Sequence, residues 1–199
     1  MAYKHIKRVI DFTGASVLTI LLSPILAITA LAVRLDSKGP VFFKQERLGY
    51  KGNVFKILKF RSMVVGAEKQ GTGVYSYKGD NRITKVGRFI RATSIDELPQ
   101  LFNILKGEMS FIGPRPALTY HPWTIDKYDE EQRRMFDVLP GITGWAQVHG
   151  RKEVPWPERI KLNVEYVDKM SFGMDMKICF STIFKVLTNA NNNNISKTN

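Results

Sequence analysis

The sequence lacks the residue patterns on which several common functions depend. Its single cysteine, Cys179, excludes an intrachain disulfide, and its apolar surroundings predict a buried thiol and a reducing compartment. The histidines at positions 5, 121 and 149 do not have the spacing of zinc ligands. No GxxxxGK(S/T), GxGxxG or GxSxG motif occurs, so P-loop, Rossmann and hydrolase-elbow sites have no support.

Negative charge is also scarce. The 199 residues contain 30 Lys and Arg against 18 Asp and Glu, and the formal net charge is +12. This excess favours a polyanionic neighbour such as nucleic acid, anionic lipid headgroups or phosphorylated small molecules, without choosing among them. We expect one domain at residues 1–188. Residues 189–199 are rich in asparagine, have nothing to bury and are expected to be disordered.

One long uncharged run lies near the start of the chain, FTGASVLTILLSPILAITALAV at residues 12–33. A helix needs about 20 apolar residues to cross a bilayer, so the run is a membrane candidate. Pro24 removes a backbone hydrogen bond and should bend the helix at Ser23-Pro24. Basic residues flank both ends, so neither end is marked as non-cytoplasmic. We therefore predict a re-entrant membrane helix with both ends on the cytoplasmic side.

Two other interpretations of this run stay open. A cleaved signal peptide also has a basic start, an apolar stretch and small residues such as Ala30 and Ala32. A straight single span that tolerates Pro24 is the second alternative. Labelling of cysteines placed before and after the run distinguishes the hairpin from the straight span.

Beyond this run the sequence predicts an α+β fold that is mainly helical. Segments 41–49 and 53–60 are rich in β-branched and aromatic residues and predict a small β-hairpin. Four glycines between residues 66 and 80 predict a mobile loop. Apolar spacing predicts helices at 83–94, 98–107, 157–170 and 174–187, and glycines predict a turn region at 140–151. The last helix mixes lysines into an apolar face, which favours an amphipathic interfacial helix over a core helix.

Two adjacent acids, Asp96 and Glu97, stand in SIDELPQ. An ionised aspartate can attack phosphorus to form an acyl phosphate, and a second acid beside it could bind Mg²⁺. A capping box of Ser94 and Glu97 is the structural alternative, although Pro99 would then clash with the preceding helical turn. Adjacent acids among many cations indicate phosphoryl chemistry, with both acids as catalytic and metal-binding candidates.

Basic and polar residues in three motifs are candidates for phosphate binding. FIGPRP holds Arg115 between two prolines, and a guanidinium on a stiff loop suits bidentate phosphate recognition. In KFRSM, Lys59 and Arg61 should face the same way by strand alternation, with solvated edge charges as the alternative. The basic helix at 83–94 contributes Arg88 and Arg91, and the segment GWAQVHGR contributes Gln147. The candidate set is Lys59, Arg61, Arg88, Arg91, Arg115 and Gln147.

The order of these motifs resembles the bacterial sugar transferases, a family of monotopic phosphoglycosyl transferases. The resemblance rests on KRVIDFTGA, the Ser23-Pro24 break, VFFKQERLG, FKILKFRSM, SIDELPQLFNILKGEMSFIGPRP and LPGITGWAQVHGR. It covers nearly everything except the asparagine-rich tail. Larger members carry further segments ahead of this core, so the chain resembles the minimal form.

The resemblance implies that a sugar 1-phosphate passes from a UDP-sugar to polyprenyl (undecaprenyl) phosphate, with release of UMP, to initiate a surface glycan. It implies that Asp96 is the nucleophile, that Glu97 is its partner, that Arg115 is the arginine of the PRP loop and that Mg²⁺ is required. It also implies a place on the cytoplasmic face of the bacterial inner membrane, in contact with lipids.

Two alternatives from other classes stay open at this point. One is a membrane-anchored basic protein that binds anionic lipid or nucleic acid, although we expect no nucleic-acid partner. Salt-sensitive nucleic-acid binding without UMP production would favour it. The other is a membrane phosphatase with an aspartate nucleophile, in which water is the acceptor. No residue spacing identifies the sugar.

Overall fold

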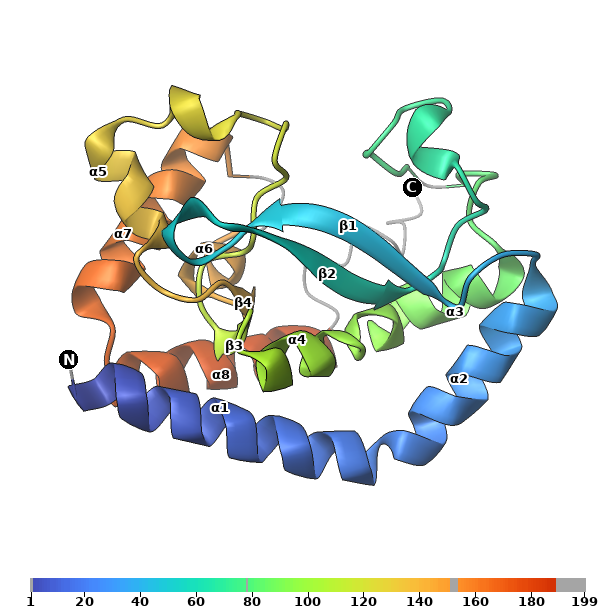
Figure 1. Cartoon of the computed structure of the whole chain (residues 1–199), viewed down its shortest axis with the longest axis horizontal. Helices are drawn as coiled ribbons and strands as arrows, with labels where there is room; N and C mark the ends of the chain where they lie inside the picture. Colours follow the sequence, from blue (N-terminus) through green and yellow to red (C-terminus); the bar gives the residue numbers. More distant parts are fainter. Residues whose placement is uncertain (1, 78, 151–153, 189–199) are drawn as a thin grey trace.

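The computed structural model describes residues 2–77, 79–150 and 154–188, and it is mostly helical with a small antiparallel hairpin (Figure 1). The predicted disorder of residues 189–199 lies outside the described residues. The helices are α1 Ala2–Leu21, α2 Ser23–Asp36, α3 Lys85–Ala92, α4 Gln100–Lys106, α5 Glu130–Arg133, α6 Trp145–Val148, α7 Trp156–Lys169 and α8 Phe172–Leu187. The strands are β1 Phe42–Leu48, β2 Val54–Phe60, β3 Ser110–Ile112 and β4 Gly141–Thr143.

The predicted bend near Ser23-Pro24 is present. α1 and α2 meet at 64° around Leu22, and Figure 1 shows them as a V along the lower edge of the molecule. Pro24 lies in the first turn of α2, where its missing N–H costs no helical hydrogen bond. In the described chain neither helix alone is long and apolar enough to cross a bilayer, but the bent pair together meets those criteria. The helical region is longer than residues 12–33, because it includes the basic residues before them.

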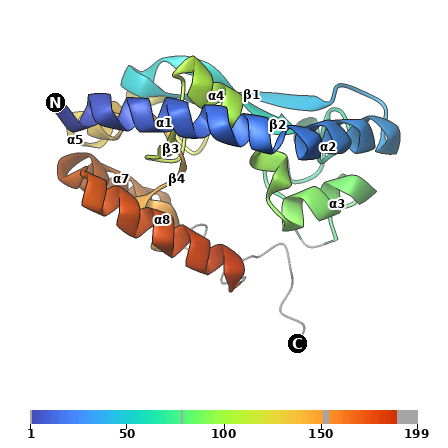
Figure 2. The ribbon, with the colours of Figure 1, turned by 90° about the horizontal axis from the view of Figure 1, so that it is seen from below.

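Those basic residues attach α1 to the rest of the protein. Arg8 donates from Nη1 to the Ile104 carbonyl (2.6 Å) and from Nη2 to the Leu105 carbonyl (3.1 Å), and so caps the last turn of α4. Lys7 forms a 2.6 Å ion pair with Asp175 of α8. Figure 2 shows α1 and α2 running along one side of the molecule with α4 above α1. The position of α4 is therefore coupled to that of α1.

The hairpin is confirmed, with β1 antiparallel to β2 and the register Phe42↔Phe60 to Leu48↔Val54. Asn103 of α4 fixes β2 from below, because its amide accepts from Leu58 N (2.9 Å) and donates to the Lys56 carbonyl (2.9 Å). Asn103 is fully buried, so these bonds replace the water that the amide and backbone would otherwise need. The middle of β2 is thereby held against the middle of α4.

The parallel pair β3–β4 was not expected from the sequence, which indicated a glycine-rich turn there. A Cβ on Gly144 would lie 2.0 Å from the Gly113 carbonyl oxygen, so only glycine allows the two segments to approach this closely. Gly113 also donates its N–H to Thr143 O at 2.9 Å. This contact places the FIGPRP loop beside the start of α6.

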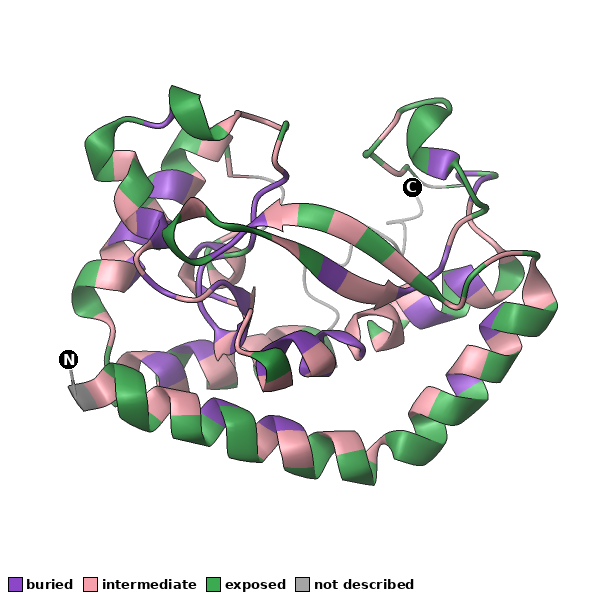
Figure 3. Cartoon of the chain, viewed as in Figure 1, coloured by how far each residue is buried: buried purple, intermediate pink, exposed green. Residues whose placement is uncertain are grey.

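The predicted amphipathic character of α8 is present. Ile178 is fully buried against Tyr166 and Ile112, whereas Phe180 and Phe184 are 68% and 67% exposed. Figure 3 also shows exposed residues, in green, along the outward sides of α1 and α2. Ile20 and Ile28 are among the exposed apolar residues of these two helices. α1, α2 and α8 thus each combine a buried side with exposed apolar residues.

Candidate active site

The two acids lie in the reversal between α3 and α4. Ser94 adopts a left-handed conformation (φ 58°), a 3₁₀ turn covers Ile95–Glu97, and α4 follows Pro99. Ser94 makes no side-chain capping bond, so the capping-box alternative is wrong. A non-glycine residue at positive φ is strained, and such strain often occurs at functional sites. The reversal brings Asp96 and Glu97 to the wall of a cavity.

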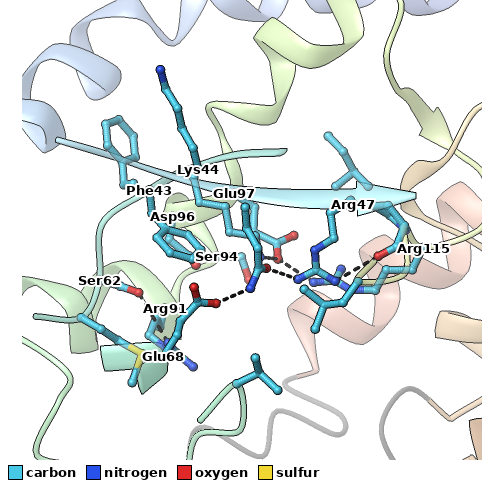
Figure 4. A pocket seen from close by; sticks show the side chains of 18 of the residues that line it. Phe43, Lys44, Arg47, Ser62, Glu68, Arg91, Ser94, Asp96, Glu97 and Arg115 are labelled. Carbon is cyan, nitrogen blue, oxygen red and sulfur yellow. Dashed lines mark hydrogen bonds and ion pairs between the residues drawn. The ribbon is translucent and has the colours of Figure 1, made fainter. Parts of the chain in front are cut away.

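Glu97 is held by two cations (Figure 4). Its Oε1 accepts from Lys59 Nζ at 2.7 Å and from Arg115 Nη2 at 3.1 Å. Burial alone would raise the pKa of Glu97, but the charges of Lys59 and Arg115 outweigh it and hold the pKa well below its usual range. Glu97 is therefore ionised at neutral pH, and it fixes the positions of both cations.

Asp96 differs from its neighbour in environment and in the direction of its pKa shift. It is half-buried, and it forms no ion pair with any described residue. Burial raises the pKa of Asp96 to about 6 and the negative charge of Glu97 adds to this, while Lys59 and Arg91 partly offset it. At pH 7 the carboxylate is mostly ionised, unpaired and more basic than an exposed aspartate. These are the properties of a nucleophile that attacks an electrophilic phosphorus.

The cavity beside Asp96 and Glu97, here called the dyad, has a volume of about 1520 Å³. One wall is apolar: Leu22, Leu101, Phe111 and Ile142 line it, and all four belong to the hydrophobic cluster between α1 and α4. Another part is lined by arginines and polar aromatic residues. A cavity with both kinds of wall suits a ligand that combines phosphate groups with an apolar chain.

Five of the six candidate phosphate-binding residues line this cavity with the two acids: Lys59, Arg61, Arg91, Arg115 and Gln147. Figure 4 shows Arg91 on the opposite side of the dyad from Arg115. Arg91 is oriented by Ser76, whose hydroxyl lies 2.6 Å from its Nη2. Gln147 donates to the Ile142 carbonyl at 2.8 Å, which orients its side chain.

Arg61 and Arg88 are placed differently. Arg61 borders the cavity, but it is buried and its guanidinium donates to the carbonyls of Val33 (3.1 Å), Ser37 (2.6 Å) and Pro40 (2.6 Å). The expectation that Lys59 and Arg61 face the same way is wrong, because β2 ends at Phe60 and strand alternation stops there. Arg88 is exposed on α3 and is not among the described residues that line the cavity.

The structure adds Arg47 to the site. Its Nη1 donates to the Pro116 carbonyl at 3.0 Å, next to Arg115, and its Nη2 donates to Gln45. Gln45 in turn donates to Glu68. Burial and the charge of Arg115 lower the pKa of Arg47 to about 10. Strand alternation within KQERLG predicts that Gln45 and Arg47 share a face, so this pattern was the available signal.

The glycine loop predicted to be mobile is folded around a buried arginine. Arg82 forms a 2.6 Å ion pair with Asp80. Its guanidinium also donates, at 2.6 to 2.9 Å, to the carbonyls of Ala67, Gln70, Gly73 and Tyr75. These bonds position Tyr75, whose hydroxyl lies 2.6 Å from Nε2 of His121 across the cavity. Composition alone does not reveal a loop ordered by one side chain.

The two adjacent carboxylates suit a magnesium ion that also binds water and substrate phosphates. They do not suit a metal held entirely by protein side chains. No group of three or more His, Cys, Asp or Glu side chains suited to a metal occurs among residues 2–77, 79–150 and 154–188. Mg²⁺ is commonly bound by one or two carboxylates together with water and substrate phosphates. Adjacent carboxylates in a cavity that can hold phosphates match this donor set.

Comparisons with known proteins identify the family of this chain. The family model described as "Bacterial sugar transferase" matches residues 2–189. "Uncharacterized sugar transferase EpsL" of Bacillus subtilis (strain 168) is 45% identical over 182 residues, covering 92% of this chain and 87% of that protein. The "UDP-glucose:undecaprenyl-phosphate glucose-1-phosphate transferase" of Escherichia coli (strain K12) is 43% identical, covering 92% of this chain but 40% of that protein.

A third relative has a different sugar in its name. The "UDP-N-acetylgalactosamine-undecaprenyl-phosphate N-acetylgalactosaminephosphotransferase" of Aeromonas hydrophila is 42% identical, covering 94% of this chain and 44% of that protein. The chain thus spans less than half the length of the Escherichia coli and Aeromonas hydrophila relatives.

Proposed function

The chain belongs to the bacterial sugar transferase family and is a transferase, and we propose that it moves a sugar 1-phosphate from a UDP-sugar to polyprenyl phosphate, with release of UMP. The observation that carries this proposal is the division between the two acids. Asp96 is a basic, unpaired carboxylate, while Glu97 is held by Lys59 and Arg115. The names of the Escherichia coli and Aeromonas hydrophila relatives both contain undecaprenyl phosphate but different UDP-sugars, so the sugar is left open.

In the first half-reaction, an oxygen of Asp96 attacks the phosphorus that carries the sugar. The Asp96 O–P bond forms, the bond from this phosphorus to the bridging oxygen breaks, and UMP leaves with the electron pair. No proton is transferred, because Asp96 is already ionised at neutral pH. The result is a covalent phosphosugar on Asp96, and the raised pKa supports the step because a more basic carboxylate is a stronger nucleophile.

In the second half-reaction, a phosphate oxygen of the polyprenyl phosphate attacks the same phosphorus. The new P–O bond joins the lipid phosphate to the sugar phosphate, and the bond to Asp96 breaks. The products are a lipid diphosphate sugar and the free Asp96 carboxylate. The apolar lining of the cavity, which includes Leu18 of α1 and Leu22 between α1 and α2, is suited to the lipid end of this acceptor.

The residues around the dyad offset the charge of the two substrates. Lys59, Arg91 and Arg115 are the cations whose charge acts on Asp96, and they would stabilise the negative oxygens of the attacked phosphorus. Glu97 positions Lys59 and Arg115 for this task. Asp96 and Glu97 would hold Mg²⁺, which when bound neutralises further phosphate charge.

The exposed apolar residues support membrane attachment. We place the α1–α2 pair in the bilayer as a re-entrant hairpin, with its apolar outer residues in the lipid and the cavity at the cytoplasmic face of the bacterial inner membrane. The 64° bend and the basic residues on both flanks favour this arrangement over a straight span. α8 would lie at the interface with Phe180 and Phe184 toward the lipid.

Enzyme assay of the purified full-length chain tests the proposal. Incubation in detergent with a panel of UDP-sugars and undecaprenyl phosphate should release UMP and form a lipid-linked sugar with at least one donor. Mass spectrometry of enzyme quenched without acceptor should find a phosphosugar on the peptide that contains Asp96. Free sugar phosphate as the main product would instead identify water as the acceptor, and the chain would be a hydrolase.

A further inference from the structure

Three arginines from three different elements line the same cavity: Arg47 on β1, Arg115 in the loop after β3, and Arg159 on α7. A β-bridge between Arg47 and Leu118 and the bond from Arg47 to Pro116 hold the first two side by side. Arg115 is paired with Glu97, but Nε of Arg47 is buried and has no hydrogen-bond partner among the described residues. A buried donor without a partner leaves the guanidinium charge of Arg47 only partly compensated by its contacts to Pro116 and Gln45.

The charge balance in this part of the cavity is positive. Burial lowers the pKa of Arg159, and the neighbouring charge of Arg115 lowers it further, as it does for Arg47. Two of the nearby acids are engaged with other residues, because Glu97 accepts from Lys59 and Arg115 and Glu68 accepts from Gln45. Guanidinium groups gathered in this way repel one another unless an anion lies between them.

An aromatic pair lies beside these arginines. The rings of Tyr75 and His121 meet edge to face at 5.3 Å, and both residues line the cavity. Tyr75 is 62% exposed, and its hydroxyl group is close enough to Arg159 to interact with it electrostatically. The carbonyl of Tyr75 accepts from Arg82 at 2.6 Å, which fixes the backbone that carries the ring. Exposed aromatic faces beside an arginine are suited to stacking on a nucleobase.

We propose that this part of the cavity binds the leaving nucleotide: Arg47 and Arg159 bind the phosphate of UMP, and Tyr75 and His121 contact its uridine. The inference rests on the proposed function and names residues for one half of the donor. When Asp96 attacks the sugar-bearing phosphorus, the bridging oxygen takes the bonding electrons and remains on UMP. The charge that develops on that oxygen is neutralised by the two guanidinium groups.

The arrangement around the dyad supports this assignment. Figure 4 shows Arg47 and Arg115 together on one side of Asp96 and Glu97, with Arg91 and Ser62 on the other. A donor bound across the dyad would place its two phosphates on different sides of the attacking oxygen. Arg47 then faces the leaving phosphate and Arg91 lies on the side of the sugar phosphate, while Arg115, paired with Glu97, stays beside the attacked phosphorus.

Binding of UMP to the full-length protein in detergent tests the inference without requiring turnover. Arg159→Gln should weaken UMP at least about tenfold, because a charge-assisted hydrogen bond is lost. The matched control is Lys161→Gln, which removes one positive charge from an exposed position of the same helix and should leave UMP affinity unchanged. Tyr75→Ala should weaken UMP roughly tenfold but leave ribose 5-phosphate unaffected, whereas Arg159→Gln should weaken both ligands.

Two results overturn the inference. One is equal UMP affinity in Arg159→Gln, Lys161→Gln and the unchanged protein. The other is an Arg159→Gln variant in which the KM for polyprenyl phosphate rises while the KM for the UDP-sugar is unchanged. Tyr75→Ala decides the matter alone if Arg159→Gln does not fold, because only the backbone of Tyr75 bonds to Arg82. A protein that binds UMP through Arg159 but transfers no sugar phosphate would contradict the proposed function and leave this inference standing.

Discussion

Nζ of Lys59 lies 2.7 Å from Oε1 of Glu97, and this ion pair joins the end of β2 to the turn that carries both acids. Arg115 reaches the same oxygen from the opposite loop. Glu97 thus holds two cations in place, while the carboxylate of Asp96 forms no ion pair with a described residue. Adjacent positions in the chain therefore have opposite pKa shifts, which is a common way to assign different tasks to two carboxyl groups.

Asp96→Asn should abolish UMP release and the trapping of sugar label on the protein, because an amide cannot form the acyl phosphate. Activity should fall by at least about a thousandfold, as expected when a covalent nucleophile is removed. Radiolabelled UDP-sugar and gel separation measure both effects. Asp126→Asn, at an exposed position of the same charge type, is the control and should retain full activity. Label retention on Asp96→Asn would show that another residue is the nucleophile.

The rate of the first half-reaction should depend on the ionisation of Asp96. Burial raises its pKa to about 6, above the ordinary value of 3.8, so the nucleophile becomes protonated as the pH falls through 6. At pH 5 only about a tenth of the sites would be ionised, and the rate should fall accordingly. Single-turnover UMP release between pH 5 and 8 measures this, because the donor diphosphate does not titrate in that range. A midpoint near pH 4 would contradict the assignment.

Lys59→Met should move that midpoint to higher pH. The charge of Lys59 is the largest influence that lowers the pKa of Asp96, so its removal favours the protonated acid. At pH 7 the loss of this cation should lower activity roughly 10- to 100-fold. Lys56→Met removes the same charge from an exposed position on the same strand and should leave both quantities unchanged. An identical pH profile in the two variants would show that Lys59 does not act on the dyad.

Arg82→Met should loosen the loop that carries Tyr75. Four carbonyls and Asp80 would lose their common donor, so cleavage by protease between residues 66 and 77 should increase roughly tenfold or more. Digestion rates followed by mass spectrometry measure this. Arg134→Met breaks ion pairs that are 40% exposed at the arginine and serves as the control. Equal digestion rates would mean that the loop does not depend on Arg82.

Cysteine labelling tests the re-entrant hairpin. In a Cys179→Ala background, Lys4→Cys and Lys38→Cys should both react with a membrane-impermeant reagent from the cytoplasmic side only. Lys4 lies in the first turn of α1 and Lys38 follows α2, so the two positions report on the two ends of the helix pair. Reaction from opposite sides would establish a straight span, and loss of the first position from the mature chain would establish signal cleavage.

The sequence predicted most of the elements that depend on neighbouring residues. The hairpin, the bend at Ser23-Pro24, α3, α4, α7 and α8 all follow from periodicity, proline or glycine within a short window. The β3–β4 pair did not, because each strand has three residues and their pairing joins distant segments. α5 was also missed, although its start carries a capping box between Asp129 and Gln132.

The candidate site was likewise predicted where it depends on short motifs and missed where it depends on contacts between distant segments. The motifs identified the dyad and Arg115 as candidates, because each stands in a short stretch with its own chemical meaning. The direction of a long side chain depends on contacts that a single sequence does not display: Arg61 turns to the end of α2, while Arg47 and Arg159 reach the cavity. The sequence motifs therefore identified the two acids more reliably than the cations that surround them.

The two hydrogen bonds from Arg8 to the last turn of α4 have a mechanical consequence. They join the helix that follows the dyad to the first arm of the membrane pair, so the two move as one body. With the pair in the bilayer, the depth of its immersion sets the height of Asp96 above the lipid. Under the proposed mechanism, a thicker or thinner membrane would then raise or lower Asp96, and the sugar phosphate attached to it, relative to the phosphate of the lipid acceptor.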